Sequence, residues 1–289
     1  TDGARKQGHL PAALRAASGA ASAMLLESAA PAVPEPEVKM CPFTKAGEAF
    51  EDLTPSTVDP GSEESDFEPA ESELEEEVAP KVPSPFAAED SLIIFDWDDT
   101  ILPSTWMQRE GLTLDAASRP SEEQAAQLRA LARQAARTLQ SAKCLGSVVL
   151  VTNAERGWIE LTCHKFMPSL LPLLESFKVV SARSAYERPG VTSPVEWKCR
   201  AFRSECGSFY RGAAADRKRN VVSLGDSLNE RSALIVVTKE MQNCCTKSLK
   251  FMEQPDVTQL QREHELVSRS LQQIVGHDGS LDLRVQVSA

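Results

Sequence analysis

The stretch that decides the fold is Ser91–Thr100, SLIIFDWDDT, in which a short apolar run ends in three aspartates. The four apolar residues are mostly β-branched or aromatic, a composition typical of a buried parallel strand. Carboxylates that follow such a strand lie at its C-terminal end, where open α/β sheets bind their ligands. The stretch therefore predicts a buried strand with an acidic site at its end.

Two of the three aspartates are expected to face the same side of the chain. Side chains alternate along an extended chain, so Asp96 and Asp98 share one side while Asp99 points to the other. Two carboxylates about 4 Å apart repel by roughly 4 kcal/mol at an effective dielectric constant of about 20. Such a pair calls for a cation or a shared proton, and we expect Mg²⁺.

Three further segments follow in a fixed order. Ser147–Asn153, SVVLVTN, is a second apolar run that ends in Thr152, and Asn220–Arg231, NVVSLGDSLNER, is a third that leads to Asp226. Between them, Lys198 lies in VEWKCRAF, which has a helical pattern. Taken singly, the threonine is explained as a helix cap, the lysine as a surface residue and the GDS as a turn. The order of all four segments is therefore the informative feature.

That order, strand-DxDxT, strand-T, K and strand-GDxxxE, resembles the four motifs of the haloacid dehalogenase-like (HAD) phosphohydrolases. The resemblance implies a hydrolase, a phosphoric monoester phosphatase that forms an aspartyl-phosphate on Asp96. It implies that Asp98 is first general acid and then general base, while Thr152 and Lys198 bind the phosphoryl oxygens. Because the dehalogenases of the family lack the second aspartate, Asp98 favours a phosphatase or phosphotransferase.

The resemblance also implies a Mg²⁺ site. The metal-binding groups that it implies are Asp96, the main-chain carbonyl of Asp98, Asp226 and Glu230. Glu230 stands where many members have aspartate, and its extra methylene lets it hold the metal through a water. Supporting positions within the motifs are Thr100, Asn153, Gly225, Ser227 and Asn229.

Strand and helix patterns alternate through the rest of the chain. Strands are expected over 92–95, 147–152, 177–182, 221–224 and 248–252, and helices over 121–140, 158–166, 197–206, 229–241 and 256–275. About five strands with helices between them predict a parallel, three-layer α/β sheet. The resemblance implies the Rossmann-like HAD core, with the sites of all four motifs at one edge.

The first 90 residues differ from the rest in composition. They hold 19 Asp and Glu against six Lys and Arg, a net charge of −13, and eleven of the 18 prolines, whereas residues 91–289 carry a net charge of +2. The run Gly61–Glu77 has too few large apolar groups to offset the entropy of ordering. We predict a disordered acidic tail rich in Pro, Ala and Glu over 1–90, with a short helix over Leu10–Leu26, and one HAD-like phosphatase domain over 91–289.

The spacing between motifs leaves no room for a folded cap domain, although Ile101–Pro120 can form a small flap. We expect a phosphorylated substrate, either a phosphoprotein or a small molecule. One alternative is a phosphatase of sugar or nucleotide metabolites. Another is a non-catalytic HAD-fold protein whose acidic tail recruits basic partners, although Asp96 and Asp98 are both present, as an enzyme requires.

Seven cysteines without C-x-x-C spacing favour reduced thiols and a cytoplasmic or nuclear location. No stretch approaches the roughly 20 apolar residues of a membrane span. We expect neither nucleic acid nor a membrane as a partner, and the sequence leaves the oligomeric state open.

Overall fold

The computed structural model describes residues 38–42, 84–214 and 216–287. Within these residues, seven strands form one sheet in the order β1-β7-β6-β5-β2-β3-β4. Six strands run parallel, and β1 pairs antiparallel with β7 at one edge. The strands are β1 (Val38–Pro42), β2 (Ser91–Phe95), β3 (Ser147–Thr152), β4 (Lys178–Ser181), β5 (Arg219–Gly225), β6 (Cys244–Lys250) and β7 (Leu281–Val287).

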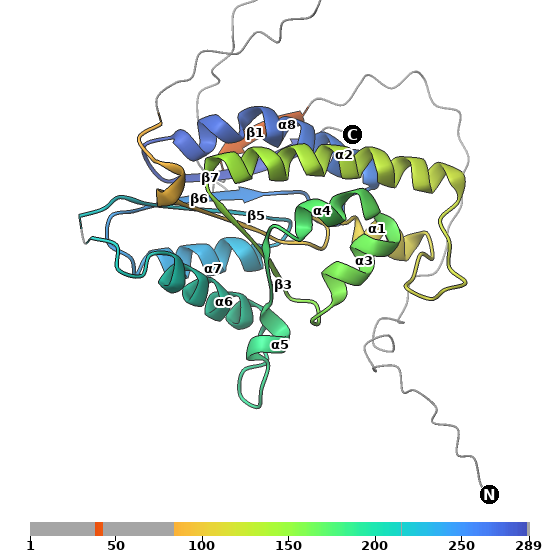
Figure 1. Cartoon of the computed structure of the whole chain (residues 1–289), viewed down its shortest axis with the longest axis horizontal. Helices are drawn as coiled ribbons and strands as arrows, with labels where there is room; N and C mark the ends of the chain where they lie inside the picture. Colours follow the sequence, from red (N-terminus) through yellow and green to blue (C-terminus); the bar gives the residue numbers. More distant parts are fainter. Residues whose placement is uncertain (1–37, 43–83, 215, 288–289) are drawn as a thin grey trace, which may run out of the picture. The chain divides into compact units, whose positions relative to one another are not determined.

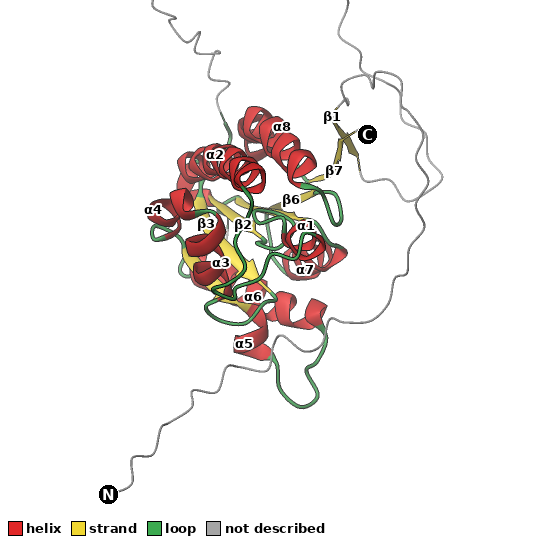
Figure 2. Ribbon diagram, turned by 90° about the vertical axis from the view of Figure 1, so that its right-hand side faces the viewer, coloured by secondary structure: helices red, strands yellow, loops and turns green. Residues whose placement is uncertain are grey.

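Helices cover both faces of the sheet (Figures 1 and 2). Alternate residues of β2 enter different cores: Ile93 and Phe95 one cluster, Leu92 and Ile94 the other. The first cluster receives side chains from α1 (Ser104–Arg109), α2 (Glu122–Leu145), α3 (Trp158–Phe166), α4 (Leu171–Leu174) and α8 (Val257–Gly276). The second receives them from α5 (Ala182–Tyr186), α6 (Pro194–Phe209) and α7 (Leu228–Thr238). The predicted three-layer, Rossmann-like α/β fold is confirmed.

The five predicted strands are all present, and their boundaries shift by a few residues. The predicted helices are present as well, but α2 and α6 are longer than expected. Ser121 caps α2 by accepting a hydrogen bond from the main-chain nitrogen of Gln124, and the helix continues to Leu145. It ends at Gly146, where a Cβ atom would lie 2.5 Å from the carbonyl oxygen of Ser91. Short elements that the sequence did not predict are α1, α4, α5 and two 3-10 helices, Ala88–Asp90 and Pro168–Leu170.

The prediction of disorder from residue 1 to 90 is wrong at two places. Val38–Pro42 forms β1, and Met40 packs on the first core cluster. Residues 84–90 are also placed: Phe86 is buried, and its ring lies 4.4 Å from the Lys247 amine. The rest of the predicted tail, including the helix expected over Leu10–Leu26, lies outside the described residues.

Two basic residues, Arg217 and Lys218, lie just before β5, at the end of this strand opposite Asp226, and both pair with acids. Arg217 forms an ion pair with Asp90, and Lys218 forms one with Asp278. The first contact joins the segment before β2 to the start of β5, and the second joins the turn between α8 and β7 to it.

The predicted flap, Ile101–Pro120, contains α1 and is packed against the core. Trp106, Met107 and Leu112 are buried, and Arg109 donates a hydrogen bond to the Gln254 side chain. The segments between β2 and β3 and between β4 and α6 are fully described, and neither contains a folded cap domain. Among the helices that the structure describes, none is long and apolar enough to cross a membrane.

Candidate functional site

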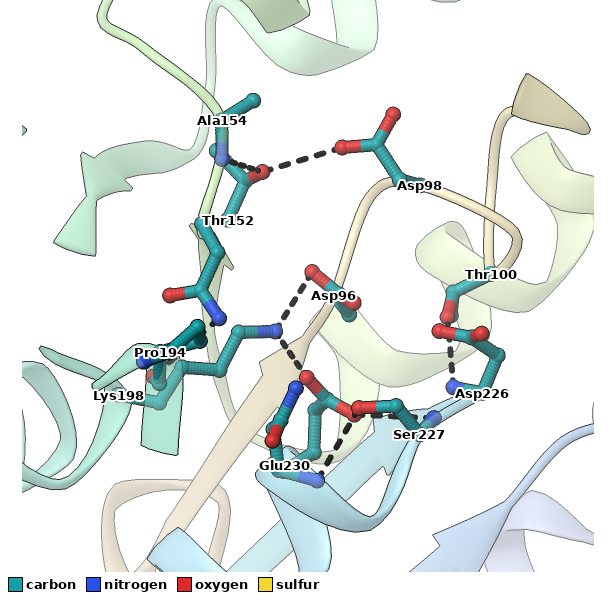
Figure 3. Close-up of polar contacts among 12 residues, drawn as sticks. Asp96, Asp98, Thr100, Thr152, Ala154, Pro194, Lys198, Asp226, Ser227 and Glu230 are labelled. Carbon is teal, nitrogen blue, oxygen red and sulfur yellow. Dashed lines mark hydrogen bonds and ion pairs between the residues drawn. The ribbon is translucent and has the colours of Figure 1, made fainter. Parts of the chain in front are cut away.

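The four motifs meet at the C-terminal ends of three adjacent strands, β5, β2 and β3. Phe95 stands opposite both Leu150 and Leu224 in the parallel register, so the residues that follow each strand emerge at the same edge. Lys198 reaches this edge from α6. Figure 3 shows the resulting group of side chains, in which Asp96 lies between the ends of β3 and β5.

Lys198 connects two of the predicted acids. Its amine lies 2.8 Å from Oδ1 of Asp96 and also forms an ion pair with Oε1 of Glu230, and its side chain is only 1% exposed. Burial alone disfavours the charged amine, but the two carboxylates raise the pKa of Lys198 above its ordinary value. Burial raises the pKa of Asp96, against the opposing effect of Lys198. The ion pairs therefore keep Lys198 charged next to the proposed nucleophile.

Glu230 is fixed by the turn between β5 and α7. Its second carboxylate oxygen, Oε2, accepts hydrogen bonds from the main-chain nitrogen and the hydroxyl of Ser227, at 3.1 and 2.6 Å. A Cβ atom on Gly225 would lie 2.4 Å from Cγ of Glu230, so this glycine allows the close approach. Burial favours the neutral form of Glu230, but Lys198 and Ser227 hold its pKa below the ordinary value.

Three carboxylates could hold a metal ion. Ligand oxygens of Asp96, Asp226 and Glu230 all lie within 4.8 Å of one another. Burial, and then the negative charge of Glu230, raise the pKa of Asp226 to about 7. A group of buried and half-buried acids with this pKa shift is short of positive charge, and carboxylate oxygens are the ligands that Mg²⁺ prefers. The donor set therefore fits a hard divalent cation, although the identity of the ion stays a prediction.

The carboxylate of Asp98 does not belong to this acidic group. Figure 3 shows it turned toward Thr152 and away from Asp96. Its Oδ2 accepts a hydrogen bond from the Thr152 hydroxyl at 3.3 Å, and its Oδ1 accepts one from the Trp158 indole at 2.8 Å. Burial raises the pKa of Asp98, and these hydrogen bonds oppose the rise. The main-chain carbonyl of Asp98 as a metal ligand stays a prediction.

Asp99 has a structural role. Its φ angle is 52°, in the left-handed region, and its carboxylate turns back over the start of α1. There it accepts hydrogen bonds from the Ser104 hydroxyl at 3.2 Å and from the main-chain nitrogen of Thr105 at 2.8 Å. The third aspartate of the motif thus caps a short helix and holds the loop that carries Asp98.

Thr100 joins the first motif to the fourth. Its hydroxyl accepts a hydrogen bond from the main-chain nitrogen of Asp226 at 3.1 Å, and its carbonyl oxygen lies 2.8 Å from Nε2 of His264. A carbonyl only accepts, so Nε2 carries the proton, and Nδ1 faces the Thr138 hydroxyl at 3.1 Å. Burial lowers the pKa of His264 from 6.5 to about 4.

This pKa shift predicts a loss of stability in acid. Between pH 6.5 and 4 the unfolded chain binds a proton at His264 that the folded chain does not, so folding weakens as the pH falls through this window. The free energy of unfolding should lose about 3 kcal/mol to this group. His264→Gln should remove that part of the pH dependence in urea unfolding at several pH values, while exposed His164→Gln should not. A pH dependence unchanged by His264→Gln would contradict the assignment.

The remaining predicted positions have structural contacts at the rim. The Asn153 amide donates a hydrogen bond to the carbonyl oxygen of Pro194 at 3.3 Å, which joins the end of β3 to the start of α6. The main-chain nitrogen of Asn229 donates to the Ser227 hydroxyl at 3.1 Å. Sequence reasoning missed Trp158, His264 and Lys250, whose amine donates to the main-chain oxygen of Asp226 at 2.8 Å.

A cavity of about 290 Å³ lies beside Thr152. It is lined by residues at the ends of β3 and β4 and in α3 and α5, including Arg156, Ile159 and Ser181.

No protein-family model, curated protein or solved structure matches this chain. Its function is therefore inferred from the motifs and from the geometry of the site.

Proposed function

We propose that this chain is a Mg²⁺-dependent phosphatase of the HAD type that forms an aspartyl-phosphate on Asp96. The observation that carries the proposal is the position of Asp96. Its carboxylate contacts the Lys198 amine, and together with the carboxylates of Asp226 and Glu230 it forms a group of three acids. A nucleophilic carboxylate, a fixed cation and a site suited to a divalent ion are the parts that phosphoryl transfer needs.

In the first step, an oxygen of Asp96 attacks the phosphorus atom. The bond between phosphorus and the leaving oxygen breaks, and that oxygen takes the proton of Asp98, which acts as a general acid. Lys198 lies 2.8 Å from the attacking carboxylate and supplies positive charge to the phosphoryl oxygens as they approach. The products are the aspartyl-phosphate and the free alcohol or phenol.

In the second step, water hydrolyses the aspartyl-phosphate. The Asp98 carboxylate takes a proton from the water while the water oxygen bonds to phosphorus. The bond from phosphorus to the Asp96 oxygen breaks, which releases phosphate and restores both aspartates. A divalent ion held by Asp96, Asp226 and Glu230 would supply positive charge to the transferring group in both steps.

The absence of a cap between the described strands supports a large substrate. A site without a cap is covered only by what it binds, and a large substrate brings remote contacts that strengthen transition-state binding. We therefore propose a phosphoprotein as the substrate, with a sugar or nucleotide phosphate as the alternative. The same assay distinguishes them when phosphopeptides and small phosphorylated metabolites are compared by kcat/KM.

The proposal predicts phosphate release from para-nitrophenyl phosphate that depends on Mg²⁺. The purified full chain should be active with millimolar Mg²⁺ and inactive after chelation by EDTA, and added Mg²⁺ should restore the activity. The reason is that the three carboxylates cannot approach a phosphate dianion without a cation between them. Absence of release with Mg²⁺, Mn²⁺ or Co²⁺, on the aryl phosphate and on the phosphopeptides alike, would reject the proposal.

A further inference from the structure

Trp158 makes a contact with Asp98 that the four motifs do not account for. The indole N–H donates a hydrogen bond to Oδ1 of Asp98 at 2.8 Å, while the other oxygen, Oδ2, faces the Thr152 hydroxyl at 3.3 Å. Trp158 is the first residue of α3, and its side chain packs on the first core cluster. The tryptophan is therefore anchored on one side and touches the proposed acid on the other.

Two indole hydrogen bonds join α3 to the loop after β2, one donated by the loop and one donated by the helix. Trp97 of the loop donates a hydrogen bond to the Thr162 hydroxyl of α3 at 3.1 Å, whereas Trp158 of α3 donates to Asp98 of the loop. The Thr162 hydroxyl also contacts the carbonyl oxygen of Trp158 at 2.7 Å. Trp97 and Thr162 are fully buried, so the helix cannot shift against the loop without breaking buried hydrogen bonds.

The turn before α3 sets the direction of the tryptophan. Gly157 has a φ angle of 89°, a conformation that side chains rarely adopt, and it stands at the N-cap of the helix. The chain can therefore turn sharply between Arg156 and Trp158, and α3 begins with the indole beside Asp98.

The hydrogen bond favours one oxygen of Asp98 as the site of the proton. An indole N–H only donates, whereas a hydroxyl such as that of Thr152 can either donate or accept. The carbonyl oxygen of a carboxylic acid is its better acceptor, so a protonated Asp98 has Oδ1 as the carbonyl oxygen and carries its hydrogen on Oδ2, the oxygen that faces Thr152. Thr152 is the residue proposed to bind the phosphoryl group, so the proton on Oδ2 faces the place proposed for that group.

We propose that Trp158 is a positioning residue, which holds Asp98 so that its Oδ2 delivers the proton to the leaving group. This inference rests on the proposed function. A merely structural role for Trp158 would make the same packing contacts but would leave the response to the leaving group unchanged. The two roles are separated by the indole N–H, which Trp158→Phe removes while it keeps most of the aromatic packing.

The test compares two substrates with different leaving groups, para-nitrophenyl phosphate and phenyl phosphate. Their kcat/KM values report the steps up to formation of the aspartyl-phosphate, in which Asp98 gives up its proton. Trp158→Phe should lower kcat/KM about tenfold for phenyl phosphate, which needs the proton, and less than about threefold for the nitrophenyl ester. Equal losses on both substrates, or no loss on either, would overturn the proposal.

Two further variants complete this test. Trp197 also donates an indole hydrogen bond of 2.8 Å, to the carbonyl oxygen of Val191, so Trp197→Phe is a matched control that should leave the ratio between the two substrates unchanged. In an Asp98→Asn background, which has no proton to position, Trp158→Phe should change kcat/KM for phenyl phosphate by less than about twofold. The same tenfold loss in both backgrounds would show that Trp158 does not act through Asp98.

One measurement tests the contact without any activity. The four tryptophans give four indole N–H resonances in a proton–nitrogen correlation spectrum of the full chain, and that of Trp158 is missing in Trp158→Phe. Asp98→Ala should shift the Trp158 resonance more than the other three. An unmoved resonance would overturn the inference itself. If the resonance moves in Asp98→Ala but the wild-type chain releases no phosphate, the contact stands and the proposed function is rejected.

Discussion

Asp96→Asn should abolish turnover, with a fall in kcat of about a thousandfold or more for para-nitrophenyl phosphate. An amide is neither a nucleophile toward phosphorus nor an anionic metal ligand, so the change removes both proposed roles of Asp96. The fold should persist, because the amide oxygen can still accept a hydrogen bond from Lys198, and the change removes one of the crowded negative charges. Thermal unfolding should therefore show a melting temperature close to that of the wild type.

Asp99→Asn is the matched control for this change. It makes the same substitution three residues further along the loop, at a carboxylate that caps α1 by accepting hydrogen bonds from Ser104 and Thr105. Asparagine caps helices about as well as aspartate, so kcat should fall by less than about tenfold. Retention of wild-type turnover by Asp96→Asn would show that this carboxylate is not the nucleophile.

Lys198→Met should have the largest effect on stability. The lysine is buried between Asp96 and Glu230, and its removal leaves two buried carboxylates without their cation. Breaking a buried ion pair in this way costs about 3–5 kcal/mol of the free energy of unfolding, measured by urea at pH 8 without metal. Turnover should be lost as well, because the cation beside the attacking oxygen is gone.

Arg203→Met provides the comparison for Lys198→Met. Arg203 pairs with Glu240 at 2.9 Å, but the two side chains are 49% and 58% exposed, so water replaces much of what the ion pair contributes. We expect a loss of less than about 1 kcal/mol. Equal losses of stability in the two variants would contradict the account of Lys198 as a buried cation on which the acidic group depends.

Most of the sheet could be predicted because its central strands are continuous apolar runs that end in polar residues. That pattern identifies β2, β3 and β5, which are buried by helices on both faces. The two strands at the other edge were missed for different reasons. In β7, LDLRVQV alternates apolar and polar residues, which is typical of a strand with only one buried face. By contrast, β1 is five residues long and lies in a segment rich in Pro and Glu.

The proposed catalytic residues could be placed together because parallel strands bring their C-terminal ends to one edge. Asp96 and Asp226 follow predicted strands, Thr152 ends one, and the order of the motifs added Lys198. The sequence could not predict the partners that orient these groups. The bond from Trp158 to Asp98 spans 60 positions and that between His264 and Thr100 spans 164, so neither leaves a local pattern. From the sequence, Trp158 could be predicted only as an apolar residue of the helix over 158–166.

The central claim is that Asp96 carries the phosphoryl group, and chemical trapping tests it most directly. The full chain is mixed with para-nitrophenyl phosphate and Mg²⁺, quenched during turnover and treated with borohydride, which reduces an acyl phosphate to an alcohol. Peptide mass spectrometry should then find homoserine in place of aspartate at position 96, and only when substrate was present. Mg²⁺-dependent release of phosphate with an unmodified Asp96, or with the reduced residue at another position, would contradict the account.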